Sequence, residues 1–325
     1  MRGNILESRH IKILLKIVVT IGLVVILIPK IDWKQFSETM ASIDVLLFCF
    51  YISLGVIDRW LMAFKWTLLL KIKHINISNL QSLNMYMVGG FFGEFLPAGV
   101  GLDLYRIRAI TKQGHSLKNV ASAVVAERIL GFSAAAALSF TAMGIVGVVY
   151  DNALLPYAYP LFIVCILSVA VLIIMVNRRI WNYVSKLLNR YHSNKLLQKA
   201  KSFYKALMEF KETPLTLWIF VFLSVIEVAL KAVFIYIGSR AFGFEVEFIY
   251  FIALVPTIFI LLKIPISIQG IGVQEGLFIF FFSLAGMAST DAFSLAFILR
   301  VGAWTLALMG AFIYISNGLL VPRKA

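Results

Sequence analysis

Long apolar runs separated by short basic segments make up most of the chain. One run follows a basic N-terminus and ends at Pro29-Lys30-Ile31-Asp32, and further runs lie near 44–70, 118–150, 154–177, 214–240 and 291–320. A helix of about 20 apolar residues crosses the roughly 30 Å hydrocarbon core of a bilayer. The pattern therefore predicts about six full membrane spans. The first is expected to be retained, because no small-residue cleavage site follows it.

Two further apolar segments, near 80–110 and 248–289, are interrupted by Pro and Gly. Basic residues flank the first on both sides, with Lys65, Lys71 and Lys73 counted as the cytoplasmic group before it, whereas the second lies between segments with few Lys or Arg. Since cytoplasmic loops are enriched in Lys and Arg, the first is expected to dip into the membrane from the cytoplasm and the second from outside. Each predicts a re-entrant helical hairpin. The same counts place both termini in the cytoplasm and the protein in the cytoplasmic (inner) membrane.

The order span, hairpin, span occurs twice, at an offset of about 170 residues. Repeat A covers about 44–150 and repeat B about 214–320, with opposite predicted orientation in the membrane. The predicted fold is an all-α polytopic membrane protein, a single transmembrane domain over residues 1–325, with about six full spans and two re-entrant helical hairpins in an inverted repeat. Inverted repeats with broken helices are typical of transporters, because each half can open one side of a central site.

The segment 178–212 interleaves basic residues with apolar residues at helical spacing. This pattern predicts a cytoplasmic amphipathic linker that lies on an anionic membrane surface.

Composition excludes most other classes. Of 325 residues 61% are hydrophobic and only 14% are charged, so a large water-soluble catalytic domain is not expected. The net charge of +14 is attributed to cytoplasmic loops facing anionic lipid, and no nucleic acid partner is expected. Cys49 and Cys165 lie in apolar runs without metal-ligand spacing, so neither a disulfide, a metal nor a cofactor is expected.

Each interrupted segment contains a Pro-Gly-acid motif at its predicted tip. The first comprises Pro97, Gly99, Gly101 and Asp103; the second comprises Pro265, Ser267, Gly270, Gly272 and Glu275. Proline ends a helix, glycine permits left-handed backbone or close approach, and an acid can cap the next helix. The two acids are therefore helix caps alone, or they also face a substrate or ion.

Charged residues inside the predicted spans are the other candidates. Each costs about 2.5 to 3.5 kcal/mol at the bilayer centre and needs a partner or a polar cavity. Arg128 and Arg300 each lie about ten residues into a span, Glu127 precedes Arg128, and Arg59 follows Asp58. These charges either bind substrate or form internal pairs, such as Asp58 with Arg59. A structural pair is favoured for Glu227 and Lys231, four residues apart, and the roles of Glu94 and Lys263 beside the tips stay open.

With these motifs in view, the chain resembles the lysylphosphatidylglycerol synthase transmembrane-region family of flippase-like membrane proteins. The resemblance covers nearly the whole chain. It rests on Pro97, Gly101, Asp103 and Arg106, on Glu127-Arg128, and on the run Pro265-Ile-Ser-Ile-Gln-Gly-Ile-Gly-Val-Gln-Glu275. Leu102 stands where a second glycine is common in the first motif.

The resemblance implies a lipid-handling protein without the soluble aminoacyl-transfer domain of larger relatives, and hence no synthase activity. The expected function is flippase-like translocation of a phospholipid or polyprenyl-linked glycolipid in cell-envelope biogenesis. The expected partner is an anionic, aminoacylated or polyprenyl-linked lipid; coupling to a proton or ion and a homo-oligomer stay open. The candidate substrate-binding residues are Arg128, Arg300, Asp103, Glu275, Glu127, Arg59 and Arg106. The alternatives are a non-transporting scaffold of an envelope-assembly complex and an integral-membrane glycosyl- or phosphotransferase.

Overall fold

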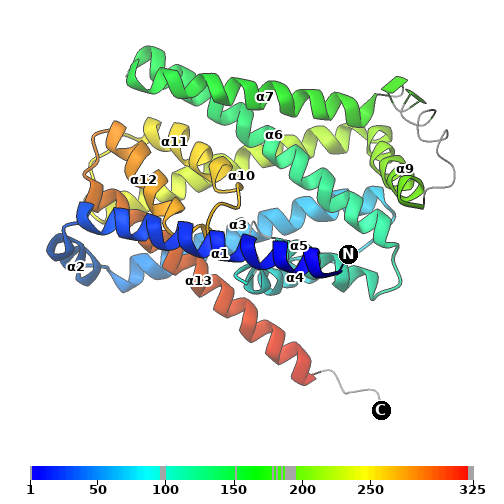
Figure 1. Ribbon diagram of the computed structural model, residues 1–325, viewed down its shortest axis with the longest axis horizontal. Helices are drawn as coiled ribbons and strands as arrows, with labels where there is room; N and C mark the ends of the chain where they lie inside the picture. The colour runs from blue at the N-terminus through cyan, green and yellow to red at the C-terminus, as the bar shows by residue number, and fades with distance from the viewer. Residues whose placement is uncertain are drawn as a thin grey trace.

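The protein is all-helical in the part that the computed structural model describes, residues 2–95, 100–150, 152–177, 179–180, 182–183, 186 and 195–320 (Figure 1). The helices are α1 (Arg2–Leu27), α2 (Trp33–Ala41), α3 (Val45–Ile72), α4 (Asn79–Gly93), α5 (Val100–Thr111), α6 (Leu117–Val149), α7 (Leu155–Val176), α9 (Lys195–Met208), α10 (Pro214–Ala241), α11 (Phe248–Leu261), α12 (Val273–Leu284) and α13 (Ser289–Leu320). Short 3-10 turns lie between several of them.

Five helices, α3, α6, α7, α10 and α13, are long and apolar enough to cross a membrane. They coincide within a few residues with the five runs predicted after the first, so those predictions are confirmed as helices. The first predicted span is more complex. Leu14–Lys30 and Trp33–Ala41 meet that criterion together, but the chain bends by 91° between them.

Both interrupted segments are pairs of short helices. α4 and α5 contain 15 and 12 residues, and α11 and α12 contain 14 and 12. At 1.5 Å per residue none exceeds about 23 Å, which is less than the hydrocarbon core of a bilayer. The predicted interruptions are therefore confirmed. In Figure 1, α11 and α12 lie toward the end of the molecule that carries α2, and α4 and α5 lie nearer the N-terminus and α9.

The buried apolar side chains form two clusters, each built around one pair of short helices. One contains Phe251 of α11 with Phe278 and Phe282 of α12. The other contains Trp66 of α3 and Tyr86 of α4. Because α6 and α10 contribute to both clusters, they connect the two cores.

The bend after α1 is held by polar contacts to the start of α13. The Asp32 carboxylate caps α2 by accepting from the backbone N–H groups of Lys34 and Gln35. The Asp32 N–H donates to Thr290 Oγ1 at 3.0 Å, and Gln35 Nε2 donates to Asp291 Oδ1 at 2.8 Å. The beginnings of α2 and α13 therefore lie at the same end of the molecule.

The described part of the linker packs on the protein. Leu207 and Phe210 are buried in the cluster around Trp66, so they are not available to a lipid surface. The Lys73 Nζ, just after α3, donates to the Ala206 carbonyl and to Glu209 Oε2. Burial lowers the pKa of this ammonium, although the Glu209 carboxylate acts in the opposite direction.

Candidate functional site

The first polar cluster, called the Arg106 cluster, contains Tyr86, Asp103, Arg106, Glu127 and Arg128. Arg106 is 2% exposed and donates to Glu127 Oε2 at 2.8 Å, to Asp103 Oδ1 at 2.6 Å and to the Tyr86 hydroxyl, which itself donates to Glu127. Arg128 Nε donates to the other oxygen of Asp103. The two guanidinium groups and two carboxylates therefore balance within the cluster.

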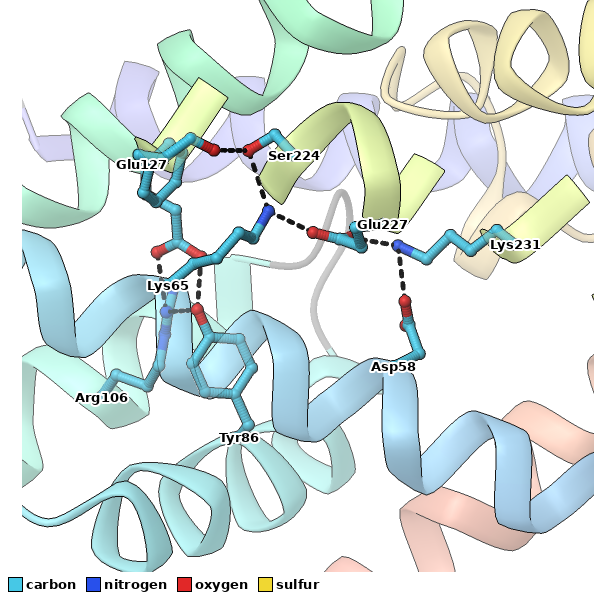
Figure 2. A network of polar contacts seen from close by, with 9 residues as sticks. Asp58, Lys65, Tyr86, Arg106, Glu127, Ser224, Glu227 and Lys231 are labelled. Atoms are coloured by element: carbon cyan, nitrogen blue, oxygen red, sulfur yellow. Dashed lines mark hydrogen bonds and ion pairs between the residues drawn. The ribbon is translucent and has the colours of Figure 1, made fainter. Parts of the chain in front are cut away.

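The second cluster, called the Lys65 cluster, joins α3 to α10 and contains Asp58, Lys65, Ser224, Glu227 and Lys231. Figure 2 shows Lys65 reaching Ser224 and Glu227, and Lys231 lying between Glu227 and Asp58. The Lys231 Nζ is 2.5 Å from Glu227 and 3.3 Å from Asp58. Its two ammonium groups and two carboxylates also balance. The predicted structural pair of Glu227 and Lys231 is confirmed.

The third cluster, called the Arg300 cluster, holds the tip between α11 and α12. Arg300 Nε donates to Glu275 Oε1 at 2.6 Å, and its terminal nitrogens donate to the carbonyls of Gln269 and Gly270, each at 3.2 Å. Glu275 Oε2 accepts from the Gly272 N–H at 2.8 Å, which caps α12. Only 8% of the Arg300 side chain is exposed, so its donors are directed at protein acceptors.

The Arg128 and Arg300 ion pairs occupy matching sequence positions. In each pair the acid precedes the arginine by 25 residues, and Glu275 and Arg300 follow Asp103 and Arg128 by 172. The environments differ, because 46% of the Arg128 side chain is exposed and only 8% of that of Arg300. Nearly half of the Arg128 side chain is thus exposed, whereas the Arg300 guanidinium is buried and donates to three acceptors at the second tip. The substrate-binding roles predicted for both stay predictions.

Three charged residues lie near these clusters without an ion pair of their own. Among the described residues, Arg59, Glu94 and Lys263 have no oppositely charged side-chain atom within 4.0 Å. The Lys263 ammonium is within electrostatic reach of one carboxylate, that of Glu227, and of three cations, Lys231, Arg128 and Arg59. Arg59 and Glu94 line a cavity of about 200 Å³ between α3, α4 and α13. The polar centre therefore contains more cations than carboxylates.

The glycine predictions at the tips agree with the geometry. Gly270 and Gly272 have φ of +69° and +78°, the left-handed region that glycine adopts easily. At Gly101 a Cβ would lie 2.2 Å from the Phe92 carbonyl oxygen, so α5 approaches α4 as closely as only glycine allows. Pro97 and Gly99 lie outside the described residues.

Ser267 and Pro265 precede these glycines at the second tip. Pro265 is exposed, and Ser267 is buried. The Ser267 Oγ has no hydrogen-bond partner among the described residues. A buried hydroxyl without a partner costs about 1 to 3 kcal/mol, so this tip retains polar capacity that the observed arrangement does not use.

Three interpretations from the sequence are corrected. Asp103 does not precede α5 as a cap; it lies in the first turn, and its carboxylate binds two arginines. Asp58 pairs with Lys231 instead of Arg59, because adjacent helical residues point in different directions. Lys65 was counted with the cytoplasmic loops, but it is 4% exposed inside α3.

Tyr86, Lys65 and Ser224 are the members of the three clusters that sequence reasoning missed. Tyr86 is uncharged and carries no pattern that separates it from a core aromatic. Lys65 could have been found, because it follows Asp58 by seven residues and therefore lies on the same helix face two turns later.

Comparisons with known proteins give one match. The family described as "Lysylphosphatidylglycerol synthase TM region" matches residues 13–310, which include all three clusters and both tips. No curated protein and no solved structure matches the chain. Because the match extends over most of the sequence, the chain belongs to the lysylphosphatidylglycerol synthase TM region family.

Proposed function

We propose that this chain binds a phosphate-bearing membrane lipid, a phospholipid or a polyprenyl-linked glycolipid, and moves it across the cytoplasmic membrane in cell-envelope biogenesis. It catalyses no covalent step itself, and both termini lie in the cytoplasm. The observation that carries the proposal is the pair Arg59 and Lys263, called here the surplus cations. Both lack an ion pair among the described residues, and Lys263 lies within electrostatic reach of Arg59, Arg128 and Lys231.

The argument is one of charge balance. The Arg106, Lys65 and Arg300 clusters are each neutral, so they need no ligand. The surplus cations outnumber Glu94, the one nearby acid without an ion pair in the described part of the chain. Arg59 is half-buried on α3, and Lys263 is exposed just after α11. A cation at membrane depth is costly unless an anion or water contacts it, and a lipid phosphate is an anion that the bilayer itself supplies.

The mechanism that we propose is alternating access between two inverted repeats. Three features support it: the matched ion pairs at an offset of 172 residues, the separate core around each pair of short helices, and the position of α11 and α12 nearer the end that carries α2, with α4 and α5 nearer the N-terminus (Figure 1). In this mechanism α4 with α5 and α11 with α12 are re-entrant hairpins. Rocking of one repeat against the other exposes the phosphate site first on one side and then on the other.

Proteoliposomes with a fluorescent anionic phospholipid test this function. Lys263→Gln and Arg59→Gln are each expected to slow translocation about tenfold, since one charge-assisted hydrogen bond is worth about 1.5 to 3 kcal/mol. Arg108→Gln, an equal charge change on the exposed face of α5, serves as the control and should retain the wild-type rate. If both variants translocate as fast as the wild type, the phosphate site is wrong.

A scaffold without transport is the second candidate, and one observation favours it. Each of the three clusters is neutral and can be explained entirely as a cross-link between helices. A scaffold predicts that purified wild-type protein moves no lipid, whereas a transferase predicts chemical conversion of the labelled lipid. The same proteoliposomes separate the three activities.

A further inference from the structure

An apolar groove runs along the surface between α3, α10 and α13, apart from the charged residues discussed above. The region between its walls has a volume of about 480 Å³, which includes space open to the surroundings. Its floor is formed by buried side chains, Leu54, Ile235 and Leu299, and its rim by exposed ones, among them Leu47 and Ile237. The groove therefore reaches the surface at its rim and is closed beneath.

The groove leads to the charged centre. Its residues lie in the first third of α3, the last third of α10 and the first third of α13, which places it toward the end of the molecule that carries α2. Asp58 follows Leu54 by one helical turn, and Lys231 precedes Phe234 by almost one turn. The groove thus ends beside the Asp58–Lys231 pair, which remains partly exposed, 16% and 28% respectively.

Tyr51 marks the junction between the two regions. It lines the groove, and its ring packs so closely on α13 that a Cβ at Gly302 would lie 2.2 Å from Tyr51 Cε1. Its hydroxyl is within electrostatic reach of Asp58 and Arg59. An elongated amphiphile with its apolar part in the groove would therefore have its polar end at Arg59.

We propose that this groove binds one hydrocarbon chain of the lipid whose phosphate is bound by the surplus cations, so that the lipid enters sideways from the half of the bilayer next to α2. This inference rests on the proposed function. The charge complementarity selects the occupant: Arg59, which has no ion pair among the described residues, favours an anionic head at the inner end beside the neutral Asp58–Lys231 pair, and the apolar lining favours a hydrocarbon chain. A peptide would leave its backbone groups without partners in this groove.

Gly238 provides a direct test, because it lines the groove on α10 and a Cβ there would meet nothing within 4 Å. Gly238→Leu fills the groove, and leucine is a better helix former than glycine, so α10 should be preserved. Gly144→Leu is the matched control. It changes the same residue type inside a helix, with equal free space, on α6 and outside the groove.

The measurement compares two anionic phospholipids binding to the full chain in detergent: one with a photoreactive 16-carbon chain and one with six-carbon chains. In Gly238→Leu, photolabelling by the long-chain lipid is expected to fall about tenfold, while the affinity for the short-chain lipid stays unchanged. Gly144→Leu is expected to be photolabelled as strongly as the wild type. Equal long-chain labelling of both leucine variants would overturn the groove while leaving the phosphate site intact. A wild-type protein that binds neither lipid would overturn the proposed function as well. Equal labelling by a diacylglycerol with the same photoreactive chain would also overturn the proposal, since the head would then play no part.

Discussion

Arg128 and Arg300 are matching residues that the surroundings give different roles. Arg300 donates from Nε and from both terminal nitrogens to protein acceptors, a carboxylate and two carbonyls at the second tip. Arg128 shares Asp103 with the buried Arg106 and keeps nearly half of its side chain exposed. A sequence can indicate that both arginines lie at similar depth, but it cannot show how many acceptors the tip backbone supplies to each.

The difference in exposure between the two arginines predicts different effects of the same substitution on stability and on transport. Arg300→Gln leaves Glu275 buried without its cation and should lower the free energy of unfolding by about 3 to 5 kcal/mol. Arg128→Gln should lower it by less than about 1 kcal/mol, as for exposed pairs, while slowing lipid translocation. Chemical denaturation in detergent and transport per folded molecule are the two measurements. Equal destabilisation by both variants would contradict the different roles given to the two arginines. Arg300→Lys should lower the free energy of unfolding by an intermediate amount, because lysine keeps the charge but loses the forked geometry of the guanidinium group.

At the scale of helices, the sequence predicts most of what is observed. The five later spans and both interruptions follow from apolar length and from Pro and Gly, because a bilayer imposes these constraints locally. The predictions that were wrong concern residues whose positions depend on tertiary contacts. Lys65 was placed in a loop because basic residues usually face the cytoplasm, but its partner Glu227 is 162 residues away. The sequence predicts the amphipathic linker on lipid, but in its described part Leu207 of α9 and Phe210 of the following 3-10 turn (Glu209–Glu212) pack on the core around Trp66.

Docking of α9 should depend on pH through Lys73. Burial lowers the pKa of this ammonium, Glu209 partly offsets the shift, and Lys118 adds to it. Between that lowered pKa and the ordinary value of 10.5, the undocked state binds more protons than the docked state. Raising the pH through this window therefore strengthens docking of α9. Below the lowered pKa the Lys73 ammonium stays charged in the docked state, so docking carries the full cost of burying that charge and is weakest there.

A spin label at Lys205→Cys, in a background of Cys49→Ser and Cys165→Ser, measures this docking. The label should become less mobile as the pH rises through the window. Lys73→Met removes the titrating group and should abolish that pH dependence. If the methionine variant shows the same pH dependence as the wild type, Lys73 is not its source.

At the scale of the whole molecule, the contact between the two tips could not be predicted from any local sequence pattern. Gln269 at the second tip has a φ of +55° and donates from Nε2 to the Glu94 carbonyl, at the end of α4. The buried Ser267 hydroxyl beside it has no partner among the described residues. A left-handed glutamine and an unsatisfied hydroxyl both cost free energy. We therefore infer that this tip has a second arrangement, in which the Gln269 contact is released.

A cross-link across this contact should stop translocation without preventing lipid binding. Gly93→Cys and Gln269→Cys are suitable, because the Gly93 carbonyl is 3.4 Å from Gln269 Nε2 and a Cβ at Gly93 meets its nearest atom at 3.9 Å. In the background lacking Cys49 and Cys165, a short cleavable thiol reagent should slow translocation at least tenfold and leave binding of the short-chain anionic lipid unchanged. Cleaving the link should restore the rate, and each single-cysteine variant treated with the reagent should behave as the wild type. If the linked protein moves lipid at the rate of the unlinked one, the two tips do not separate during transport. Rocking of one repeat against the other would then be the wrong mechanism, and the lipid would have to pass along a path that leaves the Gln269 contact closed.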